Sequence, residues 1–249
     1  MQPTFSLNHF NPLMPVKHRL QAWSRLYFAE KLRAAGFVSC KGEDLSWYRL
    51  VDGEVLQSVY LYSMHSGMFA MGSIGYGMHP LFISAPMPQK PVVQGWTDDE
   101  IMSRIHLRPP LTTTAEAPSL MVPATDSRGA EKLDEFILPL FEEHATMVDA
   151  YLWYKSRYVA METQKYTFTT QEFIDWAIYM DDTEFYPFCL RALEQKDCSI
   201  DAKAQQKKDA QIAAMRDGQR EGYMKVLNTN KKRNMTRLEK KVGICVTVE

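Results

Sequence analysis

Hydrophobic and polar positions in the N-terminal part of the chain follow first a helical period and then a strand period. Apolar residues recur at helical spacing from Val16 to Ala35, which predicts a helix over this range. Gly36 follows as the expected stop, because glycine enters the left-handed conformation without a Cβ penalty. The runs LSWYRLV, EVLQSVYLYS and GMFAMGSIGY, between Leu45 and Tyr76, then predict three strands.

The dipeptide Asp52-Gly53 separates the first two strands and is typical of a two-residue hairpin turn of type I′. The register that this turn implies pairs Val51 with Glu54, Leu50 with Val55 and Tyr48 with Gln57. Both faces of the hairpin are then largely apolar. We therefore expect other segments to cover parts of both faces.

The pattern becomes irregular between Pro80 and Pro123, where eight of the thirteen prolines lie. This composition predicts an insertion over residues 80–123 with little regular structure. The capping-box pattern Thr97-x-x-Glu100, ahead of Ile101, Met102 and Ile105, predicts one short helix within it.

Helical spacing returns from Leu133 to Tyr158, where Pro139 must either begin the helix anew or kink it. Further helices are expected after Thr169 and over Phe185 to Leu193, and the polar run from Ile200 to Leu227 offers only a thin apolar stripe. The final GICVTVE predicts an edge strand or a tail.

These elements predict an α+β fold, with an N-terminal helix packed on a small antiparallel sheet, the insertion, and a helical C-terminal half. We expect an α+β domain over residues 1–160 and a helical extension over 161–249.

Composition agrees with a globular protein, since 45% of the 249 residues are hydrophobic and 24% are charged. The sequence has no apolar run long enough to span a bilayer and no signal-peptide pattern, so a cytoplasmic location is expected. The four cysteines form no CxxC pair, and buried free thiols are expected. A bond between Cys189 and Cys198 is the less favoured alternative.

Charge is distributed unevenly along the chain. Residues 203–241 hold twelve Lys or Arg and four Asp or Glu, a local charge of +8, which leaves 17 minus 26, or −9, for the remainder. The basic cluster Lys231, Lys232 and Arg233 could bind an acidic protein or a phosphate backbone. Trp96, in the insertion, and Trp153, which falls off the apolar stripe of its helix, are further candidates for partner contacts.

The order of helix, AAGF, WYRLVDGEVLQSVYLY and a glycine-containing strand resembles a bacterial family called domain of unknown function 4304. In that family a helix ending in Gly-Phe precedes a Tyr-x-Arg-like strand and a strand with a central Gln. The resemblance covers roughly Leu20 to Tyr76, with Ile137 to Trp153 as a possible following helix. It implies an α+β fold and no assigned activity.

No catalytic or metal-binding signature is present. His65 and His79 lie at opposite ends of one expected strand, too far apart to share a metal ion with Asp52 or Glu54. Glu142-Glu143-His144 lacks the second histidine of HExxH, and the glycines Gly67, Gly72, Gly75 and Gly77 form no phosphate-loop motif. A G-x-S-x-G elbow is also missing. We expect no cofactor and no metal.

The leading hypothesis is therefore a non-enzymatic protein-binding module, such as a partner or immunity-like factor. Nucleic-acid binding through the basic C-terminal segment is the first alternative. An enzyme with a site assembled from distant residues is the second, because active sites are spatial constellations.

Overall fold

The computed structural model describes residues 16–40, 44–66, 69–83, 105–106, 131, 133–160, 170–194, 202–216 and 218–244. The chain divides into two compact units. The first comprises residues 1–49, 57–77 and 96–143, and the second comprises residues 50–56, 78–95 and 144–249. The division into folding domains at residue 160 stays a prediction.

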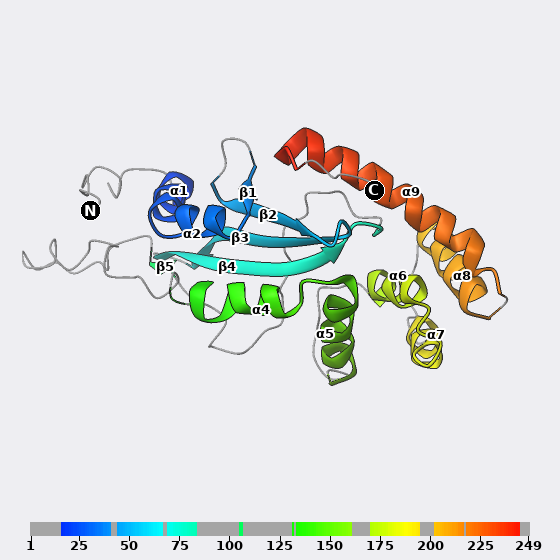
Figure 1. The fold of residues 1–249 in the computed structure, drawn as a ribbon. Helices are drawn as coiled ribbons and strands as arrows, with labels where there is room; N and C mark the ends of the chain where they lie inside the picture. The colour runs from blue at the N-terminus through cyan, green and yellow to red at the C-terminus, as the bar shows by residue number, and fades with distance from the viewer. Residues whose placement is uncertain are drawn as a thin grey trace, which may run out of the picture. The chain divides into compact units, whose positions relative to one another are not determined.

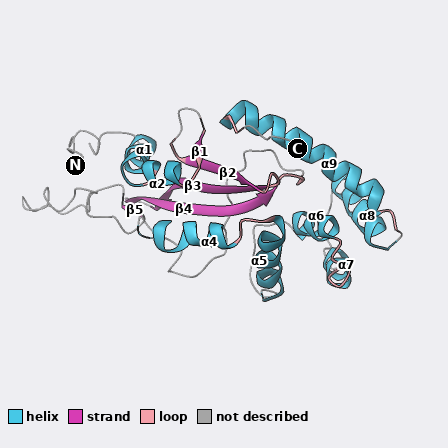
Figure 2. Ribbon diagram, in the orientation of Figure 1, coloured by secondary structure: helices cyan, strands magenta, loops and turns pink. Residues whose placement is uncertain are grey.

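A five-stranded sheet of order β1-β2-β3-β4-β5 confirms the α+β fold class (Figures 1 and 2). Its strands are β1 (Val38–Ser39), β2 (Ser46–Val51), β3 (Val55–Ser66), β4 (Phe69–Pro80) and β5 (Ile105–His106). β1 pairs with β2 and β5 with β4, in both cases antiparallel. β1 was not expected, and Ile105 lies in a strand where a short helix was predicted. The other residues of that helix, most of the insertion and the C-terminal residues 245–249 lie outside the described residues.

The hairpin turn has the expected backbone conformation, but its two strands are paired in a register shifted by one residue from the predicted one. Asp52 and Gly53 both have positive φ, 51° and 59°, as a type I′ turn requires. The Leu61 N–H donates to the Leu45 carbonyl (2.7 Å), and Arg49 contacts Gln57 on the same face. Arg49 rather than Tyr48 therefore lies opposite Gln57. Glu54 is an extra residue after the turn. One extra residue in one strand shifts the pairing by one position, as in a β-bulge.

Both faces of the hairpin are buried, as expected. Trp47 and its neighbour Tyr48 are fully buried, and so are the adjacent residues Val55 and Leu56. Successive strand residues point to opposite faces, so burial of both members of each pair means that both faces are covered.

In the first unit, the expected helix over residues 16–35 is present as α1 (Val16–Tyr27) and α2 (Ala29–Ala34). Phe28 separates them with φ −109°, and its buried ring packs on Trp23 with 4.7 Å between ring centroids. Gly36 ends α2 as predicted, with φ +80°. The Phe37 N–H bonds to the Leu32 carbonyl and the Gly36 N–H to the Arg33 carbonyl, which is a Schellman motif.

A second helical segment of this unit begins as a π-helix, η4 (Leu133–Ile137), and continues as α4 (Leu138–Glu143). Pro139 lies in the first turn of α4, so the helix begins anew there. A proline at this point lacks only an N–H that a first turn leaves unpaired. Phe141 of α4 contacts Phe37 at 5.7 Å between ring centroids, and Lys31 of α2 forms an ion pair with Asp134.

The second unit contains α5 (Met147–Ala160), α6 (Thr170–Met180), α7 (Tyr186–Glu194), α8 (Ala202–Arg216) and α9 (Arg220–Val242). α6 contacts α7, α8 and α9, and α8 also contacts α9. The thin stripe expected in the polar run is only partly right: Tyr223 and Leu227 are buried in α9, but Ala204, Ile212 and Met215 of α8 are half-buried, and the buried residues of α8 are Gln211 and Ala214 instead. α9, however, continues far beyond Leu227. It ends at Gly243, which has φ +81°.

α6 ends in a Schellman motif built on an aspartate. Asp181 has φ +55°, the Asp182 N–H bonds to the Ala177 carbonyl, and the Asp181 N–H bonds to the Ile178 carbonyl. Aspartate tolerates this region better than most residues. Its carboxylate accepts a hydrogen bond from the Tyr186 hydroxyl (3.0 Å). The break predicted at Asp181-Asp182-Thr183 is therefore confirmed.

Candidate functional site

The inner side of helix α9 is apolar near its two ends and polar in the middle. Its buried residues are Tyr223, Leu227, Asn234, Leu238 and Val242. Between Leu227 and Leu238 the one fully buried side chain is that of Asn234, which is 2% exposed, and Asn230, Lys231 and Met235 are half-buried. The centre of this helix is thus attached by polar side chains.

Asn234 binds the chain directly after β4. Its amide nitrogen donates to the carbonyl of Leu81 (2.8 Å) and to the carbonyl of Ile83 (2.9 Å). Among the described residues no other donor to these two carbonyls is present, and Leu81 and Ile83 are fully buried, so water does not readily replace the amide. One side chain therefore satisfies two carbonyls at once.

Lys231 binds the hairpin turn. Its ammonium group forms an ion pair with Glu54, whose carboxylate also accepts a hydrogen bond from the Tyr179 hydroxyl (2.9 Å). The side chains of Lys231 and Glu54 are only 24% and 25% exposed. Lys231 was expected to contact a partner. The charge of Lys231 is paired within the chain, and contact of this residue with a partner stays a prediction.

The outer side of α9 carries cations. Lys225 and Lys232 are seven residues apart, as are Arg233 and Lys240, so they share one side of a helix with 3.6 residues per turn. All four are exposed. Within the part of the chain that the structure describes, no ion pair or hydrogen bond of their side chains is present. We call these four residues the outer face of α9.

Two threonines lie between the cations of the outer face. The hydroxyl of Thr229 donates to the Lys225 carbonyl (2.8 Å), and that of Thr236 donates to the Lys232 carbonyl (3.1 Å). These hydroxyls are bonded to their own helix, as is common for threonine in helices. Val226, 53% exposed, is the one large apolar side chain of α9 among those exposed in the described residues. The surface is therefore cationic and has no aromatic side chain.

Trp153 and Trp96 do not add to this surface. Trp153 is 8% exposed, and its ring lies 4.6 Å from that of Tyr154 and 5.7 Å from that of His144. The expectation that it is exposed is wrong, because α5 is buried on more than one side. Its exposed side carries Val148 and Leu152 instead. Trp96 lies outside the described residues. Lys232 and Arg233 are exposed, so the structure keeps these two candidates available for contact.

A buried carboxylate in the second unit joins three helices. Asp175 of α6 is 1% exposed and accepts hydrogen bonds from Gln211 of α8 (2.7 Å) and from the Tyr223 hydroxyl of α9 (2.5 Å). Lys207 of α8 completes the cluster as its ion partner at 2.7 Å. Burial and then the charge of Asp175 raise the pKa of Tyr223, so this phenol stays protonated. The cluster binds helices together rather than providing a nucleophile.

Asp182 forms a second such cluster. Its carboxylate accepts a hydrogen bond from the Tyr151 hydroxyl (2.7 Å) and pairs with Lys155. Burial acts to raise the pKa of Asp182, but the bonds from Lys155 and Tyr151 outweigh it and hold this pKa below its usual value. Burial also raises the pKa of the Cys189 thiol to about 12. This thiol is free and buried, so it is an inert group.

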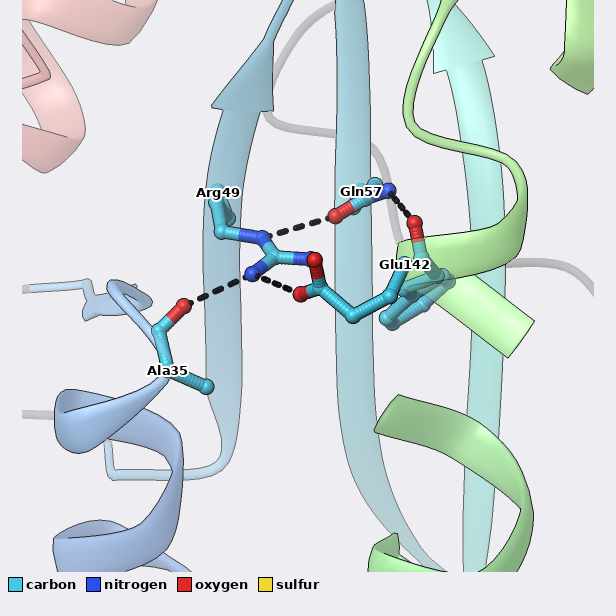
Figure 3. A network of polar contacts seen from close by, with 5 residues as sticks. Ala35, Arg49, Gln57 and Glu142 are labelled. Carbon is cyan, nitrogen blue, oxygen red and sulfur yellow. Dashed lines mark hydrogen bonds and ion pairs between the residues drawn. The ribbon is translucent and has the colours of Figure 1, made fainter. Parts of the chain in front are cut away.

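The main polar network of the first unit centres on Arg49 (Figure 3). Its guanidinium donates to the Gln57 amide oxygen (2.8 Å), the Ala35 carbonyl (2.9 Å) and the Glu142 carboxylate (2.6 Å). Gln57 in turn donates to the Phe141 carbonyl (2.8 Å). Arg49 thus ties the C-terminal ends of α2 and α4 to strands β2 and β3. Its carboxylate partner is Glu142, which is 64% exposed.

The structure places three of the histidine and glutamate candidates, His79, Glu142 and Glu143. His79 is 3% exposed in β4, and burial lowers its pKa from 6.5 to about 4, so it is neutral at pH 7. The side chain of His65 lies outside the described ones. Glu142 pairs with Arg49, and Glu143 is exposed at the end of α4, as expected for a solvent edge. Among the described residues, no group of His, Cys, Asp and Glu could hold a metal ion.

Sequence reasoning missed Asn234, Glu54 and Asp175 as organising residues. Asn234 had a visible signal, since it lies seven residues after Leu227 and four before Leu238, on the apolar stripe itself. A polar residue on such a stripe indicates a buried partner. The partners of Glu54 and Asp175 are remote in sequence and had no comparable signal.

Comparison of the chain with protein-family models, with curated proteins and with solved structures finds no match. In the described residues, every helix is too short or too polar to cross a membrane.

Proposed function

We propose that this chain is a non-enzymatic protein-binding module, and that the outer face of α9 contacts an acidic surface of its partner. The observation that carries the proposal is that Lys225, Lys232, Arg233 and Lys240 share one side of a helix and lack an ion partner in the described part of the chain. Such a surface attracts acidic groups and increases the rate of encounter with them.

The neighbouring contacts of α9 support the availability of these cations. The nearby acidic group Glu54 is used by Lys231 and by Tyr179. Along the helix itself, Glu239 is the one acidic residue between Lys225 and Lys241. The charge of the outer face is therefore not cancelled by its own helix.

Nucleic-acid binding is the second candidate, because cations repeated along one helix could also follow a phosphate backbone. Two features favour a protein partner. The outer face has no aromatic side chain on which bases could stack. Residues outside 203–241 carry a net charge of −9, which opposes the approach of a long polyanion.

Catalysis has less support in the described residues. The phenols of Tyr151 and Tyr223 have raised pKa values, and the carboxylates of Asp175 and Asp182 are already bonded to cations and hydroxyls. Perturbed groups at active sites are typically poised to react near neutral pH. These groups are instead held in forms that do not react.

Affinity capture from native lysate of the source cells, followed by elution with increasing salt, tests the proposal. We compare the wild type with an α9 variant, Lys232→Glu, Arg233→Glu and Lys240→Glu. The control variant, Arg191→Glu, Lys203→Glu and Lys208→Glu, has the same change of charge elsewhere in the second unit. The wild type and the control should retain the same acidic protein, eluted by salt, and the α9 variant should lose it, because its surface would repel carboxylates.

Retention of that protein by the α9 variant would contradict the proposal, as would loss of it from both variants.

A titration with duplex and single-stranded oligonucleotides at two salt concentrations distinguishes nucleic-acid binding, the second candidate, from protein binding. Binding at low salt that weakens steeply at high salt, and only with the outer face intact, would favour nucleic acid over protein.

A further inference from the structure

We propose that Asn234 and Lys231 are positioning residues that fix the rotation of α9 about its own axis. They would thereby decide which cations form its outer face. The contacts of α9 carry this inference, and its consequence for a partner rests on the proposed function.

The apolar contacts of α9 are not sufficient to set this rotation. Its fully buried apolar residues are two near the start, Tyr223 and Leu227, and two near the end, Leu238 and Val242, while Met235 in the middle is only half-buried. Apolar burial is non-directional, so a small rotation of the helix exchanges one set of apolar contacts for a similar set. A stripe with a polar centre therefore defines the position of α9 weakly.

The hydrogen bonds of Asn234 are directional. Its single amide nitrogen reaches the carbonyls of Leu81 and Ile83, and both bonds depend on this nitrogen pointing at one place. Any rotation of α9 would take this donor away from two buried carbonyls. In coiled coils, a single buried asparagine specifies the register of helices in the same way, at a cost in stability.

The amide oxygen of Asn234 is held as well. It accepts a weak hydrogen bond from Arg237, one turn along the helix, at 3.4 Å. This contact orients the amide group, so that its nitrogen faces Leu81 and Ile83.

Lys231 supplies a second fixed point, one turn before Asn234. Its ion pair with Glu54 attaches the helix to the hairpin turn, and Glu54 is itself held by the Tyr179 hydroxyl. The pair Lys231 and Lys232 shows the effect of this arrangement. They are adjacent and chemically identical, yet Lys231 is turned inward and Lys232 is exposed.

Amine-reactive labelling of the folded protein, quantified by mass spectrometry at each lysine, reads this rotation without any partner. In the wild type, Lys232 should react about fivefold faster than Lys231. The ion pair with Glu54 is partly exposed, and such a pair slows labelling of the Lys231 amine by about this factor. In Asn234→Leu the ratio should fall towards one. In Leu238→Ala, which removes an apolar contact at the same helix, the ratio should stay at the wild-type value even though the melting temperature falls.

The inference is overturned if Asn234→Leu keeps the wild-type ratio, or if Leu238→Ala changes the ratio to the same extent. Asn234→Thr keeps one hydroxyl donor and should give an intermediate ratio, which covers the case that Asn234→Leu does not fold. With an acidic partner in hand, Asn234→Leu should lose capture and Leu238→Ala should keep it. Failure of the wild type to capture a partner would refute the proposed function but leave the labelling result standing.

Discussion

Burial shifts the pKa values of four titratable groups of this protein away from neutral pH. His79, Tyr151, Tyr223 and Cys189 all have pKa values shifted towards the neutral form, with burial as the first cause in each case. A neutral buried group at pH 7 neither attacks a substrate nor accepts a proton readily. At the residue scale, these four groups therefore contribute through packing and hydrogen bonding in their neutral forms.

His79 should make stability depend on pH. Its pKa is about 4 in the folded protein and 6.5 in the unfolded chain, so between these values only the unfolded chain takes up the proton. Stability is fully present above pH 6.5 and is lost as the pH falls towards 4, by about 3 kcal/mol. We expect His79→Gln to remove most of this loss.

Urea unfolding of the wild type and of His79→Gln, at pH 7 and at pH 4.5, measures the effect. The decrease in the free energy of unfolding between the two pH values should be smaller in the variant. Equal decreases in the two proteins would show that the histidine is already protonated, or accessible to water, in the folded state.

At the element scale, helix ends are fixed by a few local positions. Gly36 and Gly243 end α2 and α9 with positive φ, and Asp181 ends α6 in the same region. The first turn of the long helix α9, by contrast, contains Gly222, whose φ is not positive, so glycine has no conformational purpose there. The two kinds of glycine should respond to the same substitution with opposite signs.

Gly36→Ala should destabilise the protein and Gly222→Ala should stabilise it. At Gly36, φ is +80°, and a Cβ in this region costs about 1 kcal/mol or more. Its nearest new contact, the Cδ of Arg49 at 3.6 Å, is an ordinary one, so the effect comes from the backbone. At Gly222 a Cβ meets no atom within 4 Å, and alanine is favoured in a helix by about 0.5–1 kcal/mol.

Thermal and urea unfolding of the two variants provide the measurement, with each acting as the control for the other. Destabilisation by both substitutions would mean that Gly222 is needed for a close approach that the structure does not contain. A neutral Gly36→Ala would mean that α2 ends in another conformation in solution.

At the scale of the whole molecule, charge is segregated rather than balanced. The formal net charge is −1, yet residues 203–241 carry +8 and the remainder carries −9. The outer face of α9 presents part of this positive charge to solvent. The net charge of the whole chain therefore does not indicate how the protein binds to charged surfaces.

The protein should be retained by a cation-exchange resin at pH 7 and low salt despite its net charge of −1. The α9 variant and the control variant both have a net charge of −1 minus 6, or −7. The control should be retained longer than the α9 variant, because it keeps the surface that contacts the resin. Salt-gradient elution of the three proteins gives this order directly. Co-elution of the two variants would show that the outer face of α9 does not contribute to binding of the resin.

Much of the fold could be predicted from local pattern. The stop at Gly36, the turn at Asp52-Gly53, the break at Asp181 and the restart at Pro139 each depend on the conformational preference of one or two residues. The strand register could not be predicted, because the extra residue Glu54 lies where turn and strand signals overlap. Its position is decided by its contacts with Tyr179 and Lys231, which are 125 and 177 residues away.

For the candidate site, the sequence predicted that the basic segment matters and which of its residues are charged. It could not separate Lys231 from Lys232, because adjacent lysines differ only in the side of the helix on which they lie. It also placed Trp153 at the surface, because one apolar stripe does not reveal that a second side of α5 is covered.

The sequence by itself thus determined the α+β class, the ends of several elements and the separation of charge, since each depends on local preference or on counting. Only the tertiary structure decided which charges are paired. Hydrogen bonds and ion pairs such as those of Arg49, Asp175, Lys231 and Asn234 require groups far apart in the chain to meet with fixed geometry. That meeting is a property of the packed fold, and it leaves the cations of the outer face of α9 without an ion partner among the described residues.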